Sequence, residues 1–257
     1  MVGPHRVRFA GKTDIGKVRA HNEDSLLVPK EMALAVVSDG MGGHASGEVA
    51  SRITVETIDQ YYRDTSRSGP TTWPLKLPNL EAERQRMAVA IQLANSNIFD
   101  TAAADGSKKG MGCTVDAIYF SQSRFFIGHV GDSRVYRIRN GTIQLLTEDH
   151  SFHNDYLRMK ELSADDGVNL PHKNVVVRAL GLNESVHVDV IHDEFRVGDL
   201  YLLCSDGLSG MLKDAHMLEI STATNSLDNG CHELIKAAND EGGNDNITAI
   251  LIRVERP

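Results

Sequence analysis

Cysteine is scarce in this sequence. The 257 residues include only three, Cys113, Cys204 and Cys231, and no two of them form a CxxC pair. Such wide spacing argues against a disulfide framework or a paired-cysteine motif. We therefore expect reduced, buried thiols and a protein of a reducing compartment.

Long apolar runs are also missing. No stretch approaches the ~18 consecutive apolar residues that a membrane-spanning helix needs. The first residues, MVGPHRVRFAGKT, lack the apolar core of a signal peptide. We expect a cytoplasmic protein without a membrane partner. The last strand-like run stops close to the final residue, so we expect one domain over residues 1–257.

A third absence is a cluster of basic residues. The chain has 27 Lys and Arg against 35 Asp and Glu, which gives a formal net charge of −8. This balance disfavours nucleic acid as a partner. An acidic protein that handles phosphate must neutralise it locally, with arginine or with a metal ion.

Short strand-like runs and four helical segments fill most of the chain. The runs are rich in β-branched and aromatic residues, and tight turns such as Asn140-Gly141 join neighbours, which favours antiparallel pairing. Two long early helices and two late ones favour an α+β fold built in layers. The expected strands are 7–11, 24–28, 32–39, 113–120, 124–131, 134–140, 186–192, 199–206 and 246–254, and the expected helices are 46–64, 79–102, 213–220 and 226–243.

Two segments show little periodicity. Residues 63–78 contain three prolines and are expected to form a loop. Residues 151–175 combine acids, histidines and a proline, and a long irregular segment in a compact domain is often a binding loop.

Acidic residues recur at the ends of the apolar runs. Asp39, Asp132 and Asp206 each follow one, and Asp245 comes just before the last one. If these ends meet, four carboxylates share one site, which is costly unless a cation is present. Oxygen ligands suit Mg²⁺ or Mn²⁺. The alternative for any single acid is an ordinary Asp-Gly turn.

Glycines surround the first of these acids. In VVSDGMGGHASGE, four of the nine residues after Asp39 are glycines: Gly40, Gly42, Gly43 and Gly47. A metal ion can take a backbone carbonyl as a ligand only where no side chain blocks its approach. Gly40 could offer its carbonyl beside the Asp39 carboxylate, and one carboxylate can bridge two metal ions that hold a shared hydroxide.

The segment GKVRAHNEDSLLV supplies a cation. Arg19 could bind a phosphate through two N–H groups. Glu23 and Asp24 could accept hydrogen bonds from metal-bound waters. The alternative is a solvated, charged turn.

Taken together, these segments resemble the metal-dependent PP2C family of protein serine/threonine phosphatases, in particular its short bacterial members. The resemblance covers nearly the whole chain, and eight motifs occur in the family's order. They are DIGKVRAHNEDS (14–25), VVSDGMGGHASGEVAS (36–51), GCTVDAIYF (112–120), HVGDSRVYRIRNG (129–141), LTEDHS (146–151), HKNVVVRALG (172–181), GDLYLLCSDGLSGML (198–212) and GGNDNITAILI (242–252).

The resemblance implies a four-layer α-β-β-α sandwich, two antiparallel sheets flanked by helix pairs. It implies two Mn²⁺ or Mg²⁺ ions and, as in similar bacterial enzymes, a third, weaker ion. The implied metal ligands are Asp39, Gly40, Asp206 and Asp245, with Asp132 for the third ion. It also implies that Glu23 and Asp24 contact metal-bound waters, that Arg19 binds the phosphoryl group and that residues 151–175 form a variable flap.

His44 is the residue that transfers least directly. In eukaryotic members of the family, a histidine directly follows the Asp-Gly pair and has been assigned as the general acid. Here Met-Gly-Gly intervenes, so a role in loop structure or a supporting hydrogen bond fits His44 better than proton donation. A second departure is Val177 before Arg178, where a threonine is usual, and it bears on substrate choice.

The resulting hypothesis is a phosphatase that hydrolyses phosphoserine and phosphothreonine with a metal-activated water and opposes serine/threonine kinases in bacterial signalling. Its partners would be phosphorylated proteins and a kinase, and we expect a monomer. One alternative is a non-catalytic member of the same fold that binds phosphoproteins or a kinase. Another is a nucleotide-binding protein that uses GMGGHASG as a phosphate loop, although this segment fits neither GxGxxG nor GxxxxGK[ST].

Overall fold

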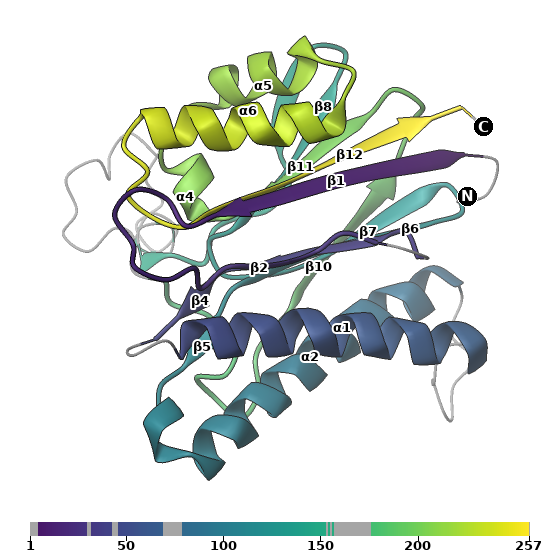
Figure 1. Ribbon diagram of the computed structural model, residues 1–257. Coiled ribbons are helices and arrows are strands. Elements are labelled where there is room, and N and C mark those ends of the chain that lie inside the picture. Colours follow the sequence, from purple (N-terminus) through teal and green to yellow (C-terminus); the bar gives the residue numbers. More distant parts are fainter. Residues whose placement is uncertain are drawn as a thin grey trace.

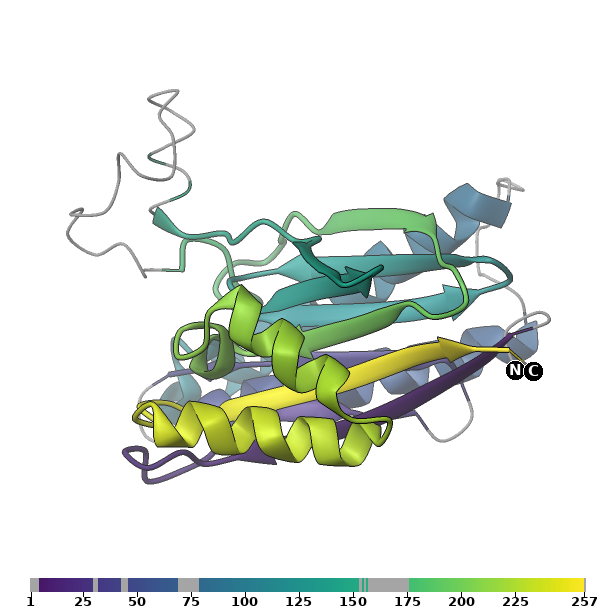
Figure 2. The ribbon, with the colours of Figure 1, turned by 90° about the horizontal axis from the view of Figure 1, so that it is seen from above.

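The computed structural model describes residues 5–29, 32–42, 46–68, 79–152, 154, 156 and 176–256. Within them, two five-stranded antiparallel sheets lie face to face, and helices cover the outer face of each (Figure 1). The predicted α-β-β-α sandwich is confirmed. Figure 2 shows the molecule from above, with the first described strand (purple) beside the last one (yellow).

The first sheet has the order β1-β12-β11-β8-β9. Its longest pairing joins the two ends of the chain, from Arg6 opposite Glu255 to Asp14 opposite Ile247. The β8–β9 hairpin turns at Asn140 and Gly141, both with positive φ, as the Asn-Gly pair predicts. The strands are β1 (Arg6–Asp14), β8 (Arg134–Arg139), β9 (Thr142–Leu145), β11 (Leu200–Cys204) and β12 (Ile247–Glu255).

The second sheet has the order β10-β7-β6-β3-β2. Every residue of β3 is buried, because this strand lies inside the sheet and between two layers. A two-stranded ladder, β4 with β5, extends beyond the end of β3. The strands are β2 (Ser25–Leu27), β3 (Leu34–Ser38), β4 (Gly40–Met41), β5 (Gly112–Cys113), β6 (Val115–Ser121), β7 (Arg124–Val130) and β10 (Asp189–Glu194).

The long helices α1 (Gly47–Ser68) and α2 (Asn79–Ala104) cover the second sheet. The stripe Met87, Ile91, Ala94 and Ile98 is fully buried, as its spacing predicts. The other sheet is covered by α4 (Asp206–Ser209), α5 (Asp214–Ala223) and α6 (Leu227–Asp240), and a short 3₁₀ helix, η1 (Gly106–Lys108), follows α2.

Apolar clusters fill all three interfaces between layers. The middle cluster, between the sheets, contains Tyr201, whose ring meets those of Phe120 and Phe125 edge to face. All three cysteines are buried and free, as expected. No described helix combines the length and the apolar character that crossing a membrane would demand.

Some predicted boundaries were wrong. Residues 63–68 continue α1 although we expected a loop from residue 63, because Thr65 packs against Arg86 of α2 and extends the helix pair. Asp206 begins α4 and does not end a strand, since β11 stops at Cys204. The remainder of the 63–78 loop, residues 69–78, lies outside the described residues.

Candidate active site

The loops that carry the predicted acids converge at one end of the sandwich, the end where Figure 1 labels α4 and β4. Asp39 follows β3, Asp132 follows β7, Asp206 starts α4 directly after β11, and Asp245 precedes β12. The charges of Asp132, Asp206 and Asp245 all raise the pKa of Asp39, so the fold brings together the four acids that were predicted to meet.

Asp39 is held through its backbone by Thr114. The Thr114 N–H donates to the Asp39 carbonyl at 2.8 Å, and the Asp39 N–H donates to Thr114 Oγ1 at 3.0 Å. Burial and then the charges of four neighbouring aspartates hold the pKa of the Asp39 carboxyl well above its ordinary value. A positive charge beside Asp39 would therefore strongly favour the ionised form of its carboxyl group.

Asp24 is the most buried of these acids, with 7% of its surface exposed. Its Oδ2 accepts hydrogen bonds from Ser205 Oγ at 2.8 Å and Thr248 Oγ1 at 2.6 Å. Burial raises the pKa of Asp24 to about 7, and the charges of Asp206 and Asp245 act in the same direction. Asp24 thus lies within the acidic group and joins β2 to the ends of β11 and β12.

Asp132 and Asp206 complete the group. Burial, followed by the charges of Asp206 and Asp149, raises the pKa of Asp132 to about 7. The pKa of Asp206 is also raised, by burial first and by Asp245 next. Carboxyl groups with raised pKa values in one polar site are a recognised mark of functional positions.

Arg19 supplies the positive charge. Its Nη2 lies 2.6 Å from Asp245 Oδ2, and 52% of its side chain is exposed. The hydrogen bond with Asp245 raises the pKa of Arg19, and the charges of Asp206 and Asp39 add to the effect. One side of the guanidinium is therefore bound to Asp245, and the other side faces solvent, where an anion can bind.

Asn246 shapes the loop that carries Arg19. Its Nδ2 donates to the carbonyls of Ile15 at 3.0 Å and His21 at 2.9 Å, and its Oδ1 accepts from the Glu23 N–H at 2.8 Å. One buried side chain thus satisfies three backbone groups of residues 15–23.

Gly40 and Gly47 approach each other closely. A Cβ on Gly40 would lie 2.3 Å from the Gly47 carbonyl oxygen and 2.5 Å from that of Glu23, and the Gly40 N–H donates to the latter at 3.1 Å. A Cβ on Gly47 would lie 2.9 Å from the Glu23 carboxyl carbon. Burial raises the pKa of Glu23, while a hydrogen bond from the Gly47 backbone opposes the rise. The two glycines therefore let the start of α1 approach Glu23 and β4.

The chemistry of these groups fits a hard divalent cation. Asp24 Oδ1 and Asp206 Oδ1 are buried and have no hydrogen-bond donor, and an ionised carboxylate can only accept, so a cation would satisfy them. Asp245 has both oxygens engaged, by Arg19 and by the Asn246 N–H. Among the described residues, no group of three or more His, Cys, Asp or Glu side chains is placed to bind a metal ion without moving. Ion binding therefore requires side-chain adjustment around the Asp245–Arg19 pair.

Two predicted features lie wholly or mostly outside the described residues. His44 is one of them. The expected flap, 151–175, is the other, since only residues 151, 152, 154 and 156 of it are described. His129, by contrast, is fully buried, and its ring nitrogens contact Asp116 Oδ1 and the Glu148 carbonyl, each at 2.9 Å, as expected for a satisfied core residue.

Sequence reasoning missed the neutral residues that hold the acids in place. They are Thr114, Ser205, Asn246 and Thr248. Three of them adjoin a predicted acid or follow it closely in the chain, and this proximity was the only available signal. Hydroxyl and amide side chains are too common in loops to stand out without the contacts themselves.

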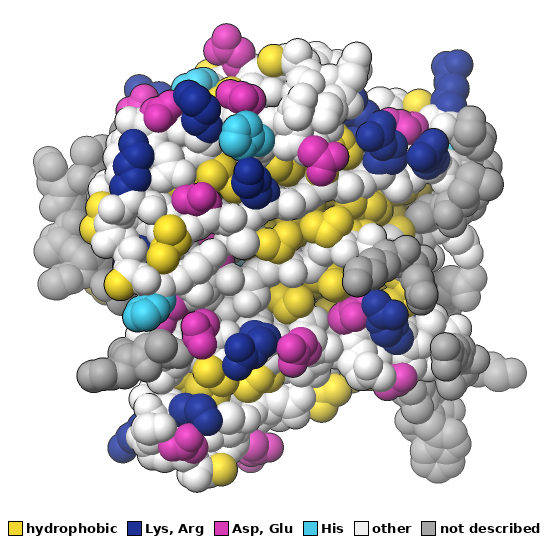
Figure 3. Space-filling view, viewed as in Figure 1, with side chains coloured by type: hydrophobic (Ala, Val, Ile, Leu, Met, Phe, Trp, Pro, Cys, Tyr) yellow, Lys and Arg dark blue, Asp and Glu magenta, His cyan; other side chains and the backbone are white. Residues whose placement is uncertain are grey.

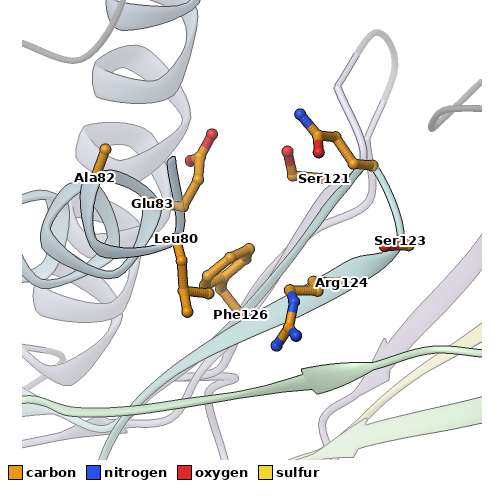
Figure 4. Close-up of a pocket in the computed structure, with 8 residues that line it drawn as sticks. Leu80, Ala82, Glu83, Ser121, Ser123, Arg124 and Phe126 are labelled. Carbon is orange, nitrogen blue, oxygen red and sulfur yellow. The ribbon is translucent and has the colours of Figure 1, made fainter. Parts of the chain in front are cut away.

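A separate pocket lies far from the acids (Figure 4). It holds about 390 Å³ and lies between the start of α2 and the β6–β7 turn, with Glu83 facing Ser121 across it and Phe126 beneath. Arg124 begins β7 and Asp132 follows its end, so the strand separates the pocket from the site by about 20 Å. This pocket is not part of the candidate active site.

The molecular surface shows mixed charge. On the face in Figure 3, the coloured Lys and Arg side chains alternate with Asp and Glu. The described side chains of this face form no continuous basic surface for nucleic-acid phosphates.

Comparison with known proteins identifies relatives along nearly the whole chain. The family model described as "Protein phosphatase 2C" matches residues 16–251. The serine/threonine phosphatase stp of Listeria innocua is 38% identical over 244 residues, which cover 94% of this chain and 93% of that protein.

Solved structures agree with this match. The serine/threonine phosphatase PstP/Ppp of Mycobacterium tuberculosis superposes with a TM-score of 0.84 at 32% identity, covering 97% of this chain and 99% of that one. The catalytic domain of PstP in complex with two manganese ions gives a TM-score of 0.79 at 32% identity, covering 97% and 98%. The fold, the converging acids and these matches show that the chain belongs to the protein phosphatase 2C family.

Proposed function

We propose that this protein is a metal-dependent phosphatase that removes phosphate from phosphoserine and phosphothreonine in other proteins. The observation that carries the proposal is the position of the exposed Arg19 beside five converging aspartates, which are Asp24, Asp39, Asp132, Asp206 and Asp245. The 2C family match and the manganese in a structural relative support the same reaction class.

Asp39, Asp206 and Asp245 would hold two Mn²⁺ or Mg²⁺ ions, together with the Gly40 carbonyl, and Asp132 would hold a third. Bound ions of this kind lower the pKa of coordinated water and so make hydroxide available near neutral pH. Glu23 and Asp24 would accept hydrogen bonds from metal-bound waters.

Arg19 would bind the phosphoryl group. The Asp245 carboxylate fixes one edge of the guanidinium, and Asn246 fixes the loop behind it. Two N–H groups directed at the non-bridging phosphate oxygens would stabilise the charge that develops on them during in-line attack. No nucleophilic side chain is required, and the three cysteines are buried and free.

We further propose that residues 1–257 act as a single phosphatase domain in the cytoplasm, working as a monomer against a serine/threonine kinase. Residues 151–175 would be a variable flap that influences the choice of phosphoprotein. Replacing residues 157–170 should change turnover of phosphopeptides more than turnover of an aryl phosphate. An equal loss on both would instead assign the segment a structural role.

For His44 we propose a supporting hydrogen bond near the site. His44→Ala should leave turnover of phosphothreonine peptides within a few-fold of the unmodified protein. A large loss confined to phosphothreonine peptides, with aryl phosphate turnover kept, would assign His44 as the proton donor instead.

The deciding experiment is phosphate release from a phosphothreonine peptide with Mn²⁺ and then with excess chelator. We expect release only with the metal ion. Asp206→Asn should abolish most of it with an unchanged circular dichroism spectrum, because the acid that starts α4 is lost while no packing changes. Absence of release from a protein that binds Mn²⁺ would favour the non-catalytic, phosphoprotein-binding alternative.

A further inference from the structure

His150 lies outside the acidic group, yet it contacts the turn that carries Asp132. The residue is 5% exposed, and its ring packs against His129 with ring centroids 4.6 Å apart. Neither the proposed metal ligands nor the phosphate contact uses it. Both of its ring nitrogens have partners from different parts of the chain.

The first nitrogen faces Gly131, the residue before Asp132. The Gly131 N–H donates to His150 Nδ1 at 3.0 Å. In addition, the backbone N–H of His150 donates to the Gly131 carbonyl at 2.7 Å. Gly131 has φ +118°, and a Cβ there would lie 2.6 Å from Thr114 Cβ. The turn is therefore enclosed by Thr114 on one side and His150 on the other.

The second nitrogen faces β10. His150 Nε2 lies 3.0 Å from Asp189 Oδ2, and Arg178 Nη1 lies 3.2 Å from Asp189 Oδ1. Arg178 Nη1 also lies 2.8 Å from His150 Nε2. Because Nδ1 accepts from the Gly131 N–H, a neutral His150 ring carries its proton on Nε2, and Asp189 is the partner there that can accept it. Burial lowers the pKa of His150, with the nearby His129 as the next cause, so the ring is neutral at neutral pH.

The residue after Asp132 is held as well. Ser133 Oγ lies 2.7 Å from Thr114 Oγ1, the same oxygen that accepts from the Asp39 N–H. Asp132 is thus flanked by two residues with fixed partners, and its position relative to Asp39 depends on both. Ser133 is fixed from within the site, whereas Gly131 is held by hydrogen bonds with His150 and by close packing on Thr114.

We propose that His150 is a positioning residue that sets the location of Asp132 by tying the Gly131 turn to Asp189 and Arg178. The inference rests on the proposed function in one respect, the role of Asp132 as a metal ligand. The tie joins the end of β7 to β10 and to the residues on either side of the segment 152–175, since the Val177 N–H also donates to the His150 carbonyl at 2.9 Å.

The two halves of this tie can be tested separately. In His150→Asn the amide oxygen replaces Nδ1 and can still accept from the Gly131 N–H, while the contact with Asp189 is lost. In His150→Gln the amide N–H₂ replaces Nε2 and can still donate to Asp189, while the hydrogen bond from the Gly131 N–H to the side chain is lost and the backbone hydrogen bond from the His150 N–H to the Gly131 carbonyl remains. His150→Ala removes both, and Asp132→Asn reports the loss of the ligand itself.

The measurement is calorimetric titration of the metal-free protein with Mn²⁺, combined with hydrogen exchange of the amides of residues 129–133. We expect His150→Gln and His150→Ala to weaken the site lost in Asp132→Asn about tenfold, the worth of roughly one buried hydrogen bond. Both should also speed exchange at Gly131. His150→Asn should stay within about twofold of the unmodified protein in both readouts.

Equal effects of the Asn and Gln variants would overturn the proposal, since they would show a general packing role. So would normal exchange at Gly131 in His150→Gln. If Asp132→Asn leaves Mn²⁺ binding unchanged, the ligand role of Asp132 fails, while the exchange data still decide whether His150 positions the turn.

Discussion

At the scale of single residues, the site depends on neutral side chains as much as on acids. Asn246 is the clearest case, because its amide satisfies the backbone of Ile15, His21 and Glu23 together. No charged residue performs this task, since one side chain has to donate twice and accept once.

Asn246→Asp keeps the shape of this side chain but removes both donors. The Arg19 loop should loosen, and kcat/KM for a phosphothreonine peptide should fall at least tenfold, as expected for two lost hydrogen bonds. Steady-state kinetics at saturating Mn²⁺ measure this. Asn229→Asp, at an exposed position in the first turn of α6, introduces the same charge and should leave kcat/KM within about twofold. A fall of equal size in Asn229→Asp would show a general charge effect instead.

At the scale of elements, long amphipathic helices were predictable and short elements were not. The buried stripe of α2 repeats every three or four residues over a long segment, so its period identified the helix and its inner face. β4 and α4 span two and four residues, which is too short to show any period. They form because their neighbours position them, as the pairing of Gly40 with Cys113 illustrates.

The α2 stripe supports stability without taking part in the site. Ile91→Ala should lower the free energy of unfolding by about 2–5 kcal/mol, because Ile91 is fully buried and packs on β7. Leu93 lies on the same helix but is 41% exposed, so Leu93→Ala should lower the free energy of unfolding by under about 1 kcal/mol. Urea unfolding measures both. Activity per folded molecule should stay unchanged, and a loss of kcat in Ile91→Ala would show that α2 influences the site.

At the scale of the whole molecule, fold and site were predictable to different degrees. An acid recurs in the chain beside each of four apolar runs, and this recurrence predicted that Asp39, Asp132, Asp206 and Asp245 lie together. The pairing of Arg19 with Asp245 could not be predicted, since it joins residues 226 positions apart through the final geometry of two loops. The order of the motifs along the chain indicated the family. The register of the paired strands and the contacts between helices could be learned only from the structure.

The acidic group should make the metal-free protein unusually sensitive to pH. Asp24 and Asp132 have pKa values of about 7 when folded and about 4 when unfolded. Between these values the folded state binds more protons than the unfolded state, so stability falls as pH rises from about 4 to 7. The buried Asp24 alone corresponds to a loss on the order of 4 kcal/mol over this whole range.

Urea unfolding of chelator-treated protein at pH 5.5 and pH 8 measures the part of this loss that falls between these two pH values. Saturating Mn²⁺ should remove most of it, because a cation favours the ionised carboxylates. Asp24→Asn should flatten the profile of the metal-free protein. Equal stability at the two pH values in the absence of metal would contradict the raised pKa values.

The central place of β12 also bears on how the protein is made. β12 is the last of the described strands in the chain, yet it lies between β1 and β11 and not at an edge. Until the ribosome has delivered it, β1 and β11 both present unpaired backbone groups to other chains. The residues just before it, Asp245 and Asn246, are the ones that hold Arg19 and its loop. Closure of this sheet and ordering of the Arg19 loop therefore depend on the same segment, and a nascent chain that extends only to β11 lacks both.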